Sequence, residues 1–273
     1  MKAVEMLNII KEKDKHYSIF HIPKKSGGTR IIENPSRELK TIQREILDSI
    51  LKTFPVDKNC HGFVDKRGII TNAQSHVGAV CVVNMDLKDF FHTVSKDMVI
   101  RELSRFTDTP HAIAELITYK ERLPMGAPTS PYMSNICTVI LDRKLGGLAK
   151  KHNAVYTRYA DDLTFSSKTN NDLHKIIPKV HSFIKGEGFV LNYNKTKVTR
   201  RGGRMMVTGI CVNDRLNVPR KIVKNFRAEV HQTRLSGTQD DLHVLAELKG
   251  FASHIYNANP NKGKQYLKKI SEL

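Results

Sequence analysis

The sequence lacks tryptophan, long apolar runs and closely spaced cysteines. No apolar segment approaches the roughly 20 residues that a membrane-spanning helix requires, so we expect no membrane partner. The segment Met1–Lys15 contains no hydrophobic signal-peptide region, so we expect the chain to stay in the cytoplasm where it is made. No CxxC pair is present, which argues against a zinc module and favours core cysteines in a reducing compartment. The cysteines are Cys60, Cys81, Cys137 and Cys211.

Acidic residues are scarce relative to basic ones. The chain has 45 Lys and Arg against 27 Asp and Glu, which gives a net charge of +18. From Arg200 to Leu273 the counts are 14 and 6, a local net charge of +8 (14 minus 6). A surplus of this size predicts a polyanionic partner. Nucleic acid fits better than a membrane surface, because the sequence has no basic amphipathic terminus and no lipidation motif. An ordinary solvated basic surface is the alternative.

Apolar residues make up 40% of the chain, which is enough for a sizeable core in one large domain or two intimate ones. Internal repeats and low-complexity linkers are absent. Helical and strand-like runs alternate along the chain, which predicts a mixed α and β fold. After Pro35 and Ser36, apolar residues recur at helical spacing. These residues are Leu39, Ile42, Ile46 and Ile50.

Proline, serine and glycine residues indicate where further helices and strands begin or end. Ser130 and Pro131 are typical of an N-cap and a first helical position, and Gly146–Gly147 should weaken or end the helix that follows. Residues 207–212 predict one strand with a glycine at position 209. Pro219 is expected to open a helix that Gly237 closes.

The predicted helix after Pro219 carries its basic residues on one face. Their spacings of four, three, four and three place them in a single stripe. The stripe is Arg220, Lys224, Arg227, His231 and Arg234. Val223, Phe226 and Val230 form an apolar stripe about a quarter turn away, at roughly 100° per residue. We therefore expect one face to pack on the protein and the other to contact nucleic acid; the alternative is an ordinary exposed helix.

Three aspartates stand in settings that are unusual for surface acids. Residues 79–85 are apolar and rich in valine, which predicts a buried strand that presents Asp86 at its end. Residues 156–167 place Asp161 and Asp162 between β-branched and aromatic residues, which is typical of a hairpin with the two acids at its tip. Carboxylates packed together repel one another unless a cation holds them, and Mg²⁺ prefers such oxygen ligands. The three acids therefore indicate a metal site for phosphate chemistry.

These residues also belong to motifs that resemble those of the reverse transcriptase family. The sequence Tyr-Ala-Asp-Asp at 159–162 is a form of the family's catalytic box, and residues 84–91 resemble its first palm motif. Residues 123–131 resemble the nucleotide-pocket motif, and residues 191–196 resemble the palm motif that follows the catalytic box. The four motifs occur in the family's order over about two-thirds of the chain. Four ordered motifs are far more specific than the catalytic box alone.

The resemblance is closest to the bacterial retron type. Asn72 and His76 fit the NAxxH element of that type, and Val207, Thr208 and Gly209 fit its VTG element. The short chain without a nuclease domain agrees with this type. Group II intron-like, CRISPR-associated and abortive-infection reverse transcriptases are the alternatives within the family. A structured-RNA-binding protein with little polymerase activity is the alternative of another class, although buried acids without a use are costly.

The resemblance implies an α+β right-hand fold. Fingers and palm, interleaved over residues 1–213, would include an antiparallel palm sheet, and a helical thumb would cover residues 214–273. Asp86, Asp161 and Asp162 would be catalytic and would hold two Mg²⁺ ions. The Phe91 side chain would be the steric gate against a ribose 2′-hydroxyl.

Further residues would bind the incoming dNTP. Lys24 and Arg30 would grip its triphosphate, as point charge and planar fork, and Lys195 would neutralise or protonate the leaving pyrophosphate. Met125 and Gly126 belong to the nucleotide-pocket motif, where many relatives have glutamine in place of Met125. Methionine cannot hydrogen-bond the sugar well, so this pocket is expected to depend on packing, with altered nucleotide affinity or fidelity.

Retron resemblance implies partners as well. These would be a structured noncoding RNA, the branched RNA–DNA product that is primed from a 2′-hydroxyl of that RNA, and a separate effector protein in antiphage defence. The residues expected to bind RNA are Asn72, His76, Val207, Thr208, Gly209, Arg220, Lys224, Arg227 and Arg234.

Overall fold

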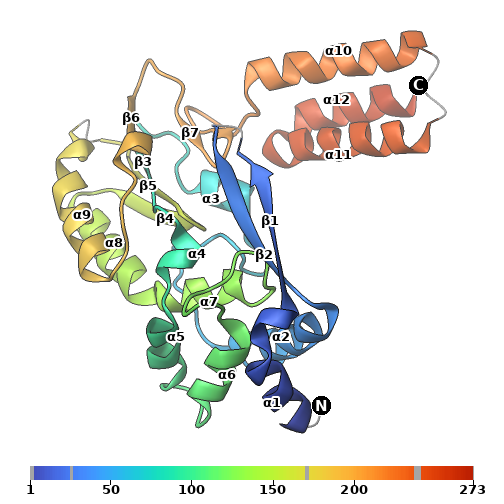
Figure 1. Cartoon of the computed structure of the whole chain (residues 1–273). Coiled ribbons are helices and arrows are strands. Elements are labelled where there is room, and N and C mark those ends of the chain that lie inside the picture. Colours follow the sequence, from blue (N-terminus) through green and yellow to red (C-terminus); the bar gives the residue numbers. More distant parts are fainter. Residues whose placement is uncertain (1–2, 25–26, 170–171, 237–240, 273) are drawn as a thin grey trace.

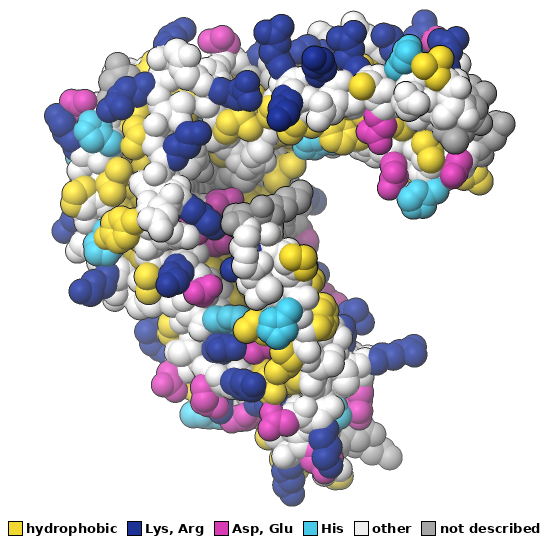
Figure 2. Space-filling model, turned by 45° about the horizontal axis from the view of Figure 1, so that its top comes forward, with side chains coloured by type: hydrophobic (Ala, Val, Ile, Leu, Met, Phe, Trp, Pro, Cys, Tyr) yellow, Lys and Arg dark blue, Asp and Glu magenta, His cyan; other side chains and the backbone are white. Residues whose placement is uncertain are grey.

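Figure 1 shows the computed structural model of the chain, which describes residues 3–24, 27–169, 172–236 and 241–272. A body of mixed helices and strands carries a bundle of three C-terminal helices at the end opposite the N-terminus. Figure 2 shows the hollow between this bundle and the body. The mixed α and β architecture that the sequence predicts is confirmed.

An antiparallel sheet with the strand order β4-β5-β3-β6 lies in the body. Its strands are β3 (Cys81–Asp86), β4 (Val155–Tyr159), β5 (Asp162–Ser167) and β6 (Lys197–Arg200). Because β3 lies between β5 and β6, it is buried along nearly its whole length, which suits its valine-rich sequence. The predicted strand is confirmed, and Asp86 is its last residue.

Helices surround this sheet, with α8 and α9 on its outer side in Figure 1. Between residues 69 and 186 the helices of the body are α3 (Ile69–Gln74), α4 (Phe90–Thr93), α5 (Lys96–Leu103), α6 (Pro110–Ile117), α7 (Ser130–Cys137), α8 (Val139–Lys151) and α9 (Ile177–Gly186). Short 3-10 turns lie at Lys13–His16, Leu51–Thr53, Leu173–Ile176 and Tyr193–Lys195.

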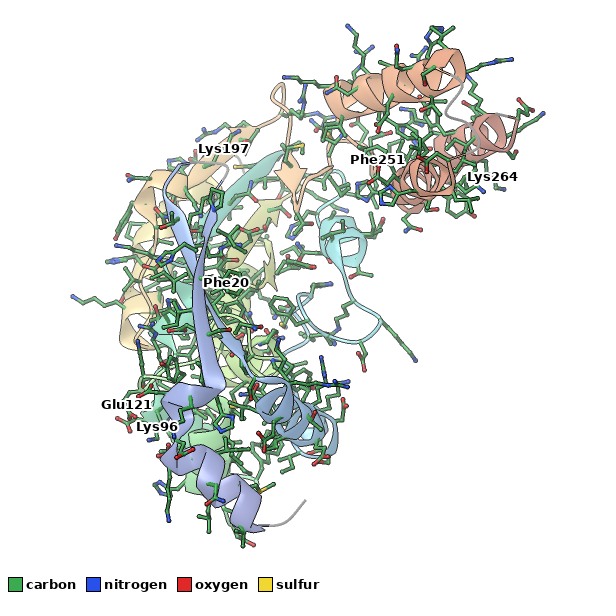
Figure 3. All side chains as sticks on the ribbon, turned by 45° about the vertical axis from the view of Figure 1, so that its right-hand side comes forward. Phe20, Lys96, Glu121, Lys197, Phe251 and Lys264 are labelled. Atoms are coloured by element: carbon green, nitrogen blue, oxygen red, sulfur yellow. The ribbon has the colours of Figure 1, made fainter. Side chains whose placement is uncertain are left out.

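A separate antiparallel hairpin, β1 (Tyr17–Pro23) with β2 (Thr29–Pro35), crosses the front of the body. It follows α1 (Ala3–Lys11) and precedes α2 (Arg37–Ser49). Most of β1 is exposed, and Figure 3 labels Phe20 along it. The predicted helix after Ser36 is confirmed, because the Ser36 side chain accepts a hydrogen bond from the Leu39 amide and caps α2.

The C-terminal bundle consists of α10 (Arg220–Ser236), α11 (Leu242–Ala258) and α12 (Pro260–Ser271). Figure 3 labels Phe251 and Lys264 on its second and third helices. The helices α11 and α12 cross closely at Gly263, where an added Cβ would lie 2.2 Å from the Tyr256 Cα. Phe226 of α10 joins a core shared with α11, α12 and the segment before the bundle. The helix predicted after Pro219 is confirmed, whereas its predicted end at Gly237 lies outside the described residues.

Two local predictions are wrong. Ser130 is not an N-cap but the first residue of α7, and its hydroxyl donates to the Pro124 carbonyl at 2.7 Å. The predicted helix is divided at Thr138, and Gly146–Gly147 lie inside α8 instead of ending it. Gly146 faces the Asn59 side chain, with which an added Cβ would collide at 2.8 Å. Tertiary packing thus explains a glycine that local propensity reads as a helix end.

The prediction of a single strand over residues 207–212 is also wrong. These residues contribute to a small hairpin, β7 (Met206–Val207) with β8 (Ile210–Cys211). The turn residues Thr208 and Gly209 have φ values of 46° and 81°, the left-handed conformations that a tight two-residue turn requires. The glycine at 209 therefore marks a reversal of the chain.

Candidate active site

The three aspartates singled out in the sequence lie together at one end of the central sheet. Asp86 and Asp162 are paired residues of the neighbouring strands β3 and β5. Asp161 lies in the two-residue turn that joins β4 to β5. The Leu87 amide donates to the Asp161 carbonyl at 2.9 Å, so the turn is tied to the chain directly after Asp86. Residues far apart in the sequence thereby form one acidic centre.

The Asp86 carboxylate is held by two side chains from the segment before β6. Asp86 is 6% exposed. Lys195 Nζ donates to its Oδ2 at 2.8 Å, and Asn192 Nδ2 donates to its Oδ1 at 3.1 Å. The backbone amide of Asn192 also donates to the backbone carbonyl of Asp86 at 2.8 Å. Asn192 was not among the predicted site residues, although its place in the motif at residues 191–196 was the available signal.

Burial and neighbouring charges at this centre oppose ionisation of Asp161 and Asp162. Partial burial, followed by the charges of Asp161 and Asp86, raises the pKa of Asp162 to about 6, although this side chain is open to solvent. Burial, and to a smaller extent Asp86, raises the pKa of Asp161. The hydrogen bond to Asp86 raises the pKa of Lys195. Positive charge at this centre would therefore be stabilising.

The donor set suits a hard divalent cation. Within the described ranges, no three His, Cys, Asp or Glu side chains are already grouped as metal ligands. The carboxylates of Asp86, Asp161 and Asp162 nevertheless supply the oxygen atoms that Mg²⁺ prefers. Burial, and then the neighbouring carboxylates, raise the pKa values of Asp161 and Asp162, which a bound cation would counteract. Lys195 balances part of the negative charge on Asp86.

A buried network supports the turn that carries Asp161. Arg158 of β4 is fully buried, and its Nη1 donates to the Ala160 carbonyl at 3.0 Å. Its Nη2 lies 2.7 Å from Oδ2 of the equally buried Asp142, on α8. Gly62 packs so tightly against the turn that an added Cβ would lie 2.5 Å from the Ala160 nitrogen. The turn, with Ala160 at a φ of 55°, is therefore fixed from two sides.

Aromatic side chains lie beside the acidic centre. Phe91, on α4, is half-buried, and its ring centroid lies 6.2 Å from that of Phe63. The Phe63 ring also lies 6.4 Å from that of Tyr159, directly before the turn that carries Asp161. Phe63 is 43% exposed and was not singled out from the sequence. An aromatic residue in a loop gives no periodic signal, so only the fold reveals this neighbour of Phe91.

The loop with Met125 and Gly126 runs along the edge of the β1–β2 hairpin. The Glu33 amide donates to the Met125 carbonyl at 2.8 Å. Gly126 has a φ of 140°, and an added Cβ would lie 2.7 Å from the Glu33 carbonyl oxygen, so only glycine fits. The buried Glu33 carboxylate binds Arg122 at 2.7 Å and lies 3.2 Å from His92, the residue after Phe91. Glu33 thus joins the hairpin, the pocket loop and the helix of Phe91.

Lys24 and Arg30 lie exposed at the outer end of the β1–β2 hairpin. The Lys24 amide donates to the Gly28 carbonyl at 3.0 Å, which closes the hairpin. The charge of Arg30 opposes the rise in the pKa of Asp161, so Arg30 lies within electrostatic range of the acidic centre. The structure therefore brings the basic end of the hairpin toward the acids.

Asn72 and His76 are buried, each with 1% exposure, so their side chains are not on a surface that RNA can contact. The two His76 ring nitrogens lie 2.6 Å from Ser166 Oγ and 2.7 Å from Thr157 Oγ1, which fixes α3 on the sheet. Burial, together with the charge of His61, lowers the pKa of His76 to about 3, so this side chain stays neutral. The expectation that these two side chains bind RNA is thus not supported by their positions.

Val207, Thr208 and Gly209 differ in accessibility. Val207 is buried in the core beneath the bundle, whereas Gly209 is exposed. Thr208 is half-buried, and its hydroxyl donates to the Ile69 carbonyl at 2.9 Å. This bond ties the β7–β8 turn to the start of α3. The two retron-like sequence elements are therefore neighbours in space.

The predicted basic stripe of α10 is exposed along its whole length. Phe226 is buried and Val223 and Val230 are half-buried, so the apolar stripe faces the bundle core as expected. Figure 2 shows Lys and Arg side chains along the outer side of the bundle, where α10 lies, away from the hollow. This surface is free to contact an anionic partner outside the hollow.

The fold and the acidic centre define a polymerase palm, and comparisons with known proteins agree. A family model described as "Reverse transcriptase (RNA-dependent DNA polymerase)" matches residues 22–245. The Retron Ec86 reverse transcriptase of Escherichia coli is 31% identical over 99% of this chain and 86% of its own length. The chain belongs to the reverse transcriptase family, with relatives of the bacterial retron type.

Two relatives from Myxococcus xanthus have the same designation. The Retron Mx65 reverse transcriptase is 37% identical over 93% of this chain, and the Retron Mx162 reverse transcriptase is 36% identical over 94%. The chain spans only 64% and 61% of the lengths of these two proteins.

Solved structures show the fold at low sequence identity. Telomerase from Candida tropicalis superposes with a TM-score of 0.55 at 11% identity, over 94% of this chain and 56% of that one. Telomerase from Candida albicans gives 0.53 at 12% identity, over 92% and 56%. The right-hand polymerase fold predicted from the motifs is confirmed.

Proposed function

We propose that the chain is a retron-type RNA-directed DNA polymerase that binds a structured noncoding RNA and copies part of it into DNA. The observation that carries this proposal is the meeting of Asp86, Asp161 and Asp162 at the end of β3 and the β4–β5 turn. Membership of the reverse transcriptase family supports the same reaction.

In this reaction a primer hydroxyl oxygen bonds to the α-phosphorus of a dNTP, and pyrophosphate leaves. The chemistry that two bound Mg²⁺ ions would supply is activation of that hydroxyl and stabilisation of the leaving oxygen, and the three aspartates would hold them. Asn192 keeps the Asp86 carboxylate oriented, and Lys195, which donates to the same carboxylate, would neutralise or protonate the leaving pyrophosphate. Phe91 would exclude a 2′-hydroxyl, while Lys24, Arg30, Met125 and Gly126 would contact the nucleotide.

The cognate RNA and its RNA–DNA product would contact surfaces outside the acidic centre. The exposed stripe of Arg220, Lys224, Arg227 and Arg234 provides phosphate contacts, which give affinity but little sequence information. The half-buried Thr208 and the exposed Gly209, in the turn beside α3, would contribute to recognition of the shape of the RNA. Cytoplasmic location, a separate effector protein and a role in antiphage defence complete this proposal.

The deciding experiment combines primer extension with sequencing of co-purified nucleic acid. The wild-type protein should extend a generic primer–template with dNTPs and Mg²⁺, and should co-purify with one folded RNA joined to DNA. Asp161→Asn should lose roughly 10²- to 10³-fold or more in rate, because several kcal/mol of charge stabilisation disappear. RNA binding by this variant should persist. Co-purification without any extension would instead indicate an RNA-binding protein, and robust extension by Asp161→Asn would refute the site.

A further inference from the structure

A buried charged cluster joins three segments beside the proposed nucleotide pocket. Its centre is Glu33 of β2, which is 1% exposed. One carboxylate oxygen of Glu33, Oε1, accepts a hydrogen bond from Arg122 Nη2 at 2.7 Å, and the other, Oε2, lies 3.2 Å from His92 Nε2. His92 is the residue after Phe91, and Arg122 lies shortly before Met125. A single carboxylate therefore links the hairpin, α4 and the pocket loop.

Stability of the fold gives little reason for this cluster. A buried ion pair is often no more stabilising than well-packed apolar side chains of similar volume, because both charges lose their hydration. Glu33 Oε2 and His92 Nε2 are close but not aligned for a hydrogen bond, and neither atom has another hydrogen bond within the described residues. Buried polar atoms without such bonds cost free energy. A role in the adjoining site explains the cluster better than stability does.

The helix that carries Phe91, α4, has few hydrogen bonds of its own to fix its orientation. It contains four residues, and its N-cap residue, Asp89, provides no side-chain cap. A helix this short depends on tertiary contacts. The buried Phe90 supplies one, with its ring centroid 5.9 Å from that of Phe189, and His92 supplies another. Because positions two residues apart on a helix project roughly 200° apart, these contacts hold α4 from opposite sides and set the direction of Phe91 between them.

The backbone of Arg122 is tied to the chain directly after α4. Arg122 forms a β-bridge with Ser95, and the Leu123 amide donates to the Val94 carbonyl at 3.0 Å. The Arg122 side chain extends from this fixed backbone to the Glu33 carboxylate. Glu33 is therefore held by a segment whose position relative to α4 is itself fixed.

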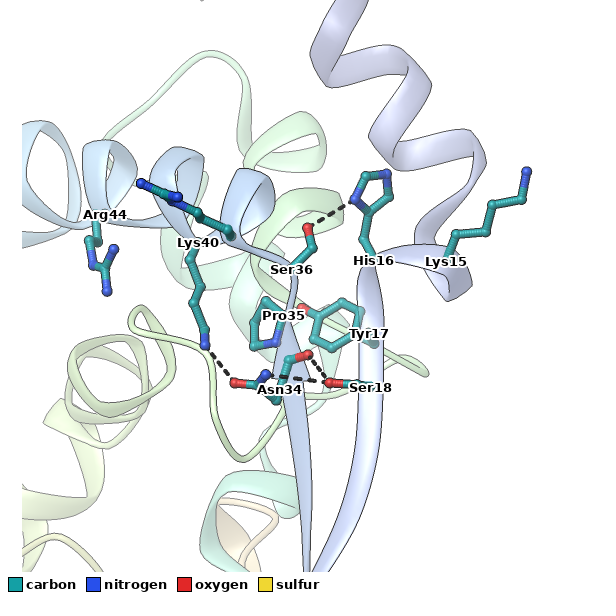
Figure 4. Close-up of a pocket in the computed structure, with 10 residues that line it drawn as sticks. Lys15, His16, Tyr17, Ser18, Asn34, Pro35, Ser36, Lys40 and Arg44 are labelled. Atoms are coloured by element: carbon teal, nitrogen blue, oxygen red, sulfur yellow. Dashed lines mark hydrogen bonds between the residues drawn. The ribbon is translucent and has the colours of Figure 1, made fainter.

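The neighbouring residue, Asn34, fixes the strand that carries Glu33. Figure 4 shows Asn34 at the base of the hairpin, where its side chain accepts a hydrogen bond from Lys40 and donates one to Ser18 at 3.4 Å. Because side chains alternate along a strand, Asn34 faces this open pocket while Glu33 points to the other face, toward α4. Glu33 thus has a fixed backbone as well as fixed partners.

This arrangement assigns Glu33 a place in nucleotide selection. We propose that Glu33, held in place by Arg122, is a positioning residue for sugar selection, and that through His92 it holds the Phe91 ring where an incoming 2′-hydroxyl would lie. The inference rests on the proposed function, because it takes Phe91 as the steric gate. Glu33 is itself too deeply buried to contact a nucleotide, so it acts through its partners.

The first test compares kcat/KM for dNTPs with kcat/KM for rNTPs. Glu33→Gln keeps the shape of the side chain and removes its charge, whereas His92→Ala removes only the contact with α4. Each variant should lower the preference for dNTPs by roughly threefold or more, but by less than Phe91→Ala does, because the ring is displaced and not removed. A purely structural role would lower both kcat/KM values together and leave their ratio unchanged, which would overturn the proposal.

The matched control is Glu102→Gln. Glu102, on α5, is also a buried glutamate, at 3% exposure, and its partners are the exposed Arg101 and Arg105, each at 3.0 Å. This variant loses a buried ion pair as Glu33→Gln does, but it should keep the wild-type preference for dNTPs. An equal change of preference in Glu102→Gln would refute a specific role of Glu33.

The second test asks whether Glu33 acts through the Phe91 ring. In a Phe91→Ala background, Glu33→Gln should cause no further change in sugar preference, because the group that it positions is absent. A further change as large as the one in the wild-type background would show that Glu33 affects the sugar by another route, and would overturn the proposal.

A binding measurement separates this inference from the proposed function. The Kd values of a matched dNTP and rNTP are measured with Mg²⁺ on a primer–template whose primer ends in a 2′,3′-dideoxynucleotide, so no bond can form. The Kd ratio should shift toward the rNTP in Glu33→Gln and in His92→Ala. A wild-type protein that binds nucleotides but extends no primer would refute the proposed function, and the Kd ratio would still decide the inference. Extension by the wild type with unchanged ratios in both variants would refute the inference alone.

Discussion

The two long hairpins of the molecule, β4–β5 and β1–β2, present charged residues in opposite ways. The first lies inside a four-stranded sheet, and β5 is buried from Leu163 to Ser167. Its turn is held by the Arg158 guanidinium and by contact with Gly62. The second is a two-stranded sheet with large apolar side chains exposed on both faces. These side chains are Ile19, Phe20, Ile22 and Ile31.

The difference follows from what each hairpin would hold. Metal ligands must stay in fixed positions because small displacements of catalytic groups are costly, and a turn held from two sides provides that rigidity. A two-stranded hairpin is only marginally stable by itself, and it leaves its faces available to nucleotides and nucleic acid. The β1–β2 hairpin is anchored at its base by α2 and along one edge by the Glu33–Met125 bond. Its outer half is therefore free to adapt to a ligand.

The largest effect on this difference between the hairpins is expected when the β4–β5 turn is displaced without removal of an expected metal ligand. Gly62→Ala places a methyl group 2.5 Å from the Ala160 nitrogen, so the turn must shift. We expect primer extension to fall by roughly 10²-fold, as for other small displacements of reacting groups, and the half-saturating Mg²⁺ concentration to rise. Gly250→Ala is the control, because an added Cβ there meets no atom within 4 Å. Normal Mg²⁺ dependence in Gly62→Ala would show that the turn tolerates displacement.

A smaller effect is expected at the boundary between the two hairpins. Phe91→Ala should raise incorporation of ribonucleotides relative to deoxyribonucleotides by roughly tenfold or more, because a ring that excludes a hydroxyl is lost. Phe63→Ala should change the same ratio less, since Phe63 only flanks Phe91 at a 6.2 Å centroid distance. The ratio of kcat/KM values measures both. An unchanged ratio in an active Phe91→Ala enzyme would place the gate elsewhere.

The pH dependence tests the electrostatics of the rigid hairpin. The pKa of Asp162 is raised to about 6, and a metal ligand must lose its proton, so Mg²⁺ affinity should fall as the pH drops through that value. Above pH 7 the half-saturating Mg²⁺ concentration should be nearly constant. Lys195 lowers the pKa values of Asp161 and Asp162, so Lys195→Met should move the midpoint to higher pH. Mg²⁺ titrations between pH 5 and 8 measure this; a midpoint that moves downward would contradict the charge arrangement.

The smallest effect is expected at Met125, in the loop beside the β1–β2 hairpin. The backbone carbonyl of Met125, not its side chain, ties this loop to the hairpin, so Met125→Gln should keep the fold and the activity. The added amide should change mainly the apparent KM for dNTPs, by less than about tenfold, because one hydrogen bond contributes roughly 1 kcal/mol. Steady-state kinetics with each dNTP measure this. A folded but inactive variant would show that the pocket requires the methionine for packing.

Sequence patterns correctly predicted those elements whose signals are local. The valine-rich run before Asp86, the cap at Ser36 and the two stripes of α10 each depend on periodicity or side-chain type within a few residues. The ordered motifs predicted the family and its fold, because the acids and their neighbours recur at characteristic positions. These predictions required no knowledge of which segments pack together.

Which side chains share a site, and which are buried, depends on the tertiary structure. Asn192 contacts Asp86 and Phe63 lies beside Phe91 only because distant segments fold together. His76, a polar residue expected to bind RNA, is instead buried, with both ring nitrogens within hydrogen-bond distance of side-chain hydroxyls of the central sheet. Long-range contacts set burial, and burial decides whether a polar residue supports the fold or meets a ligand.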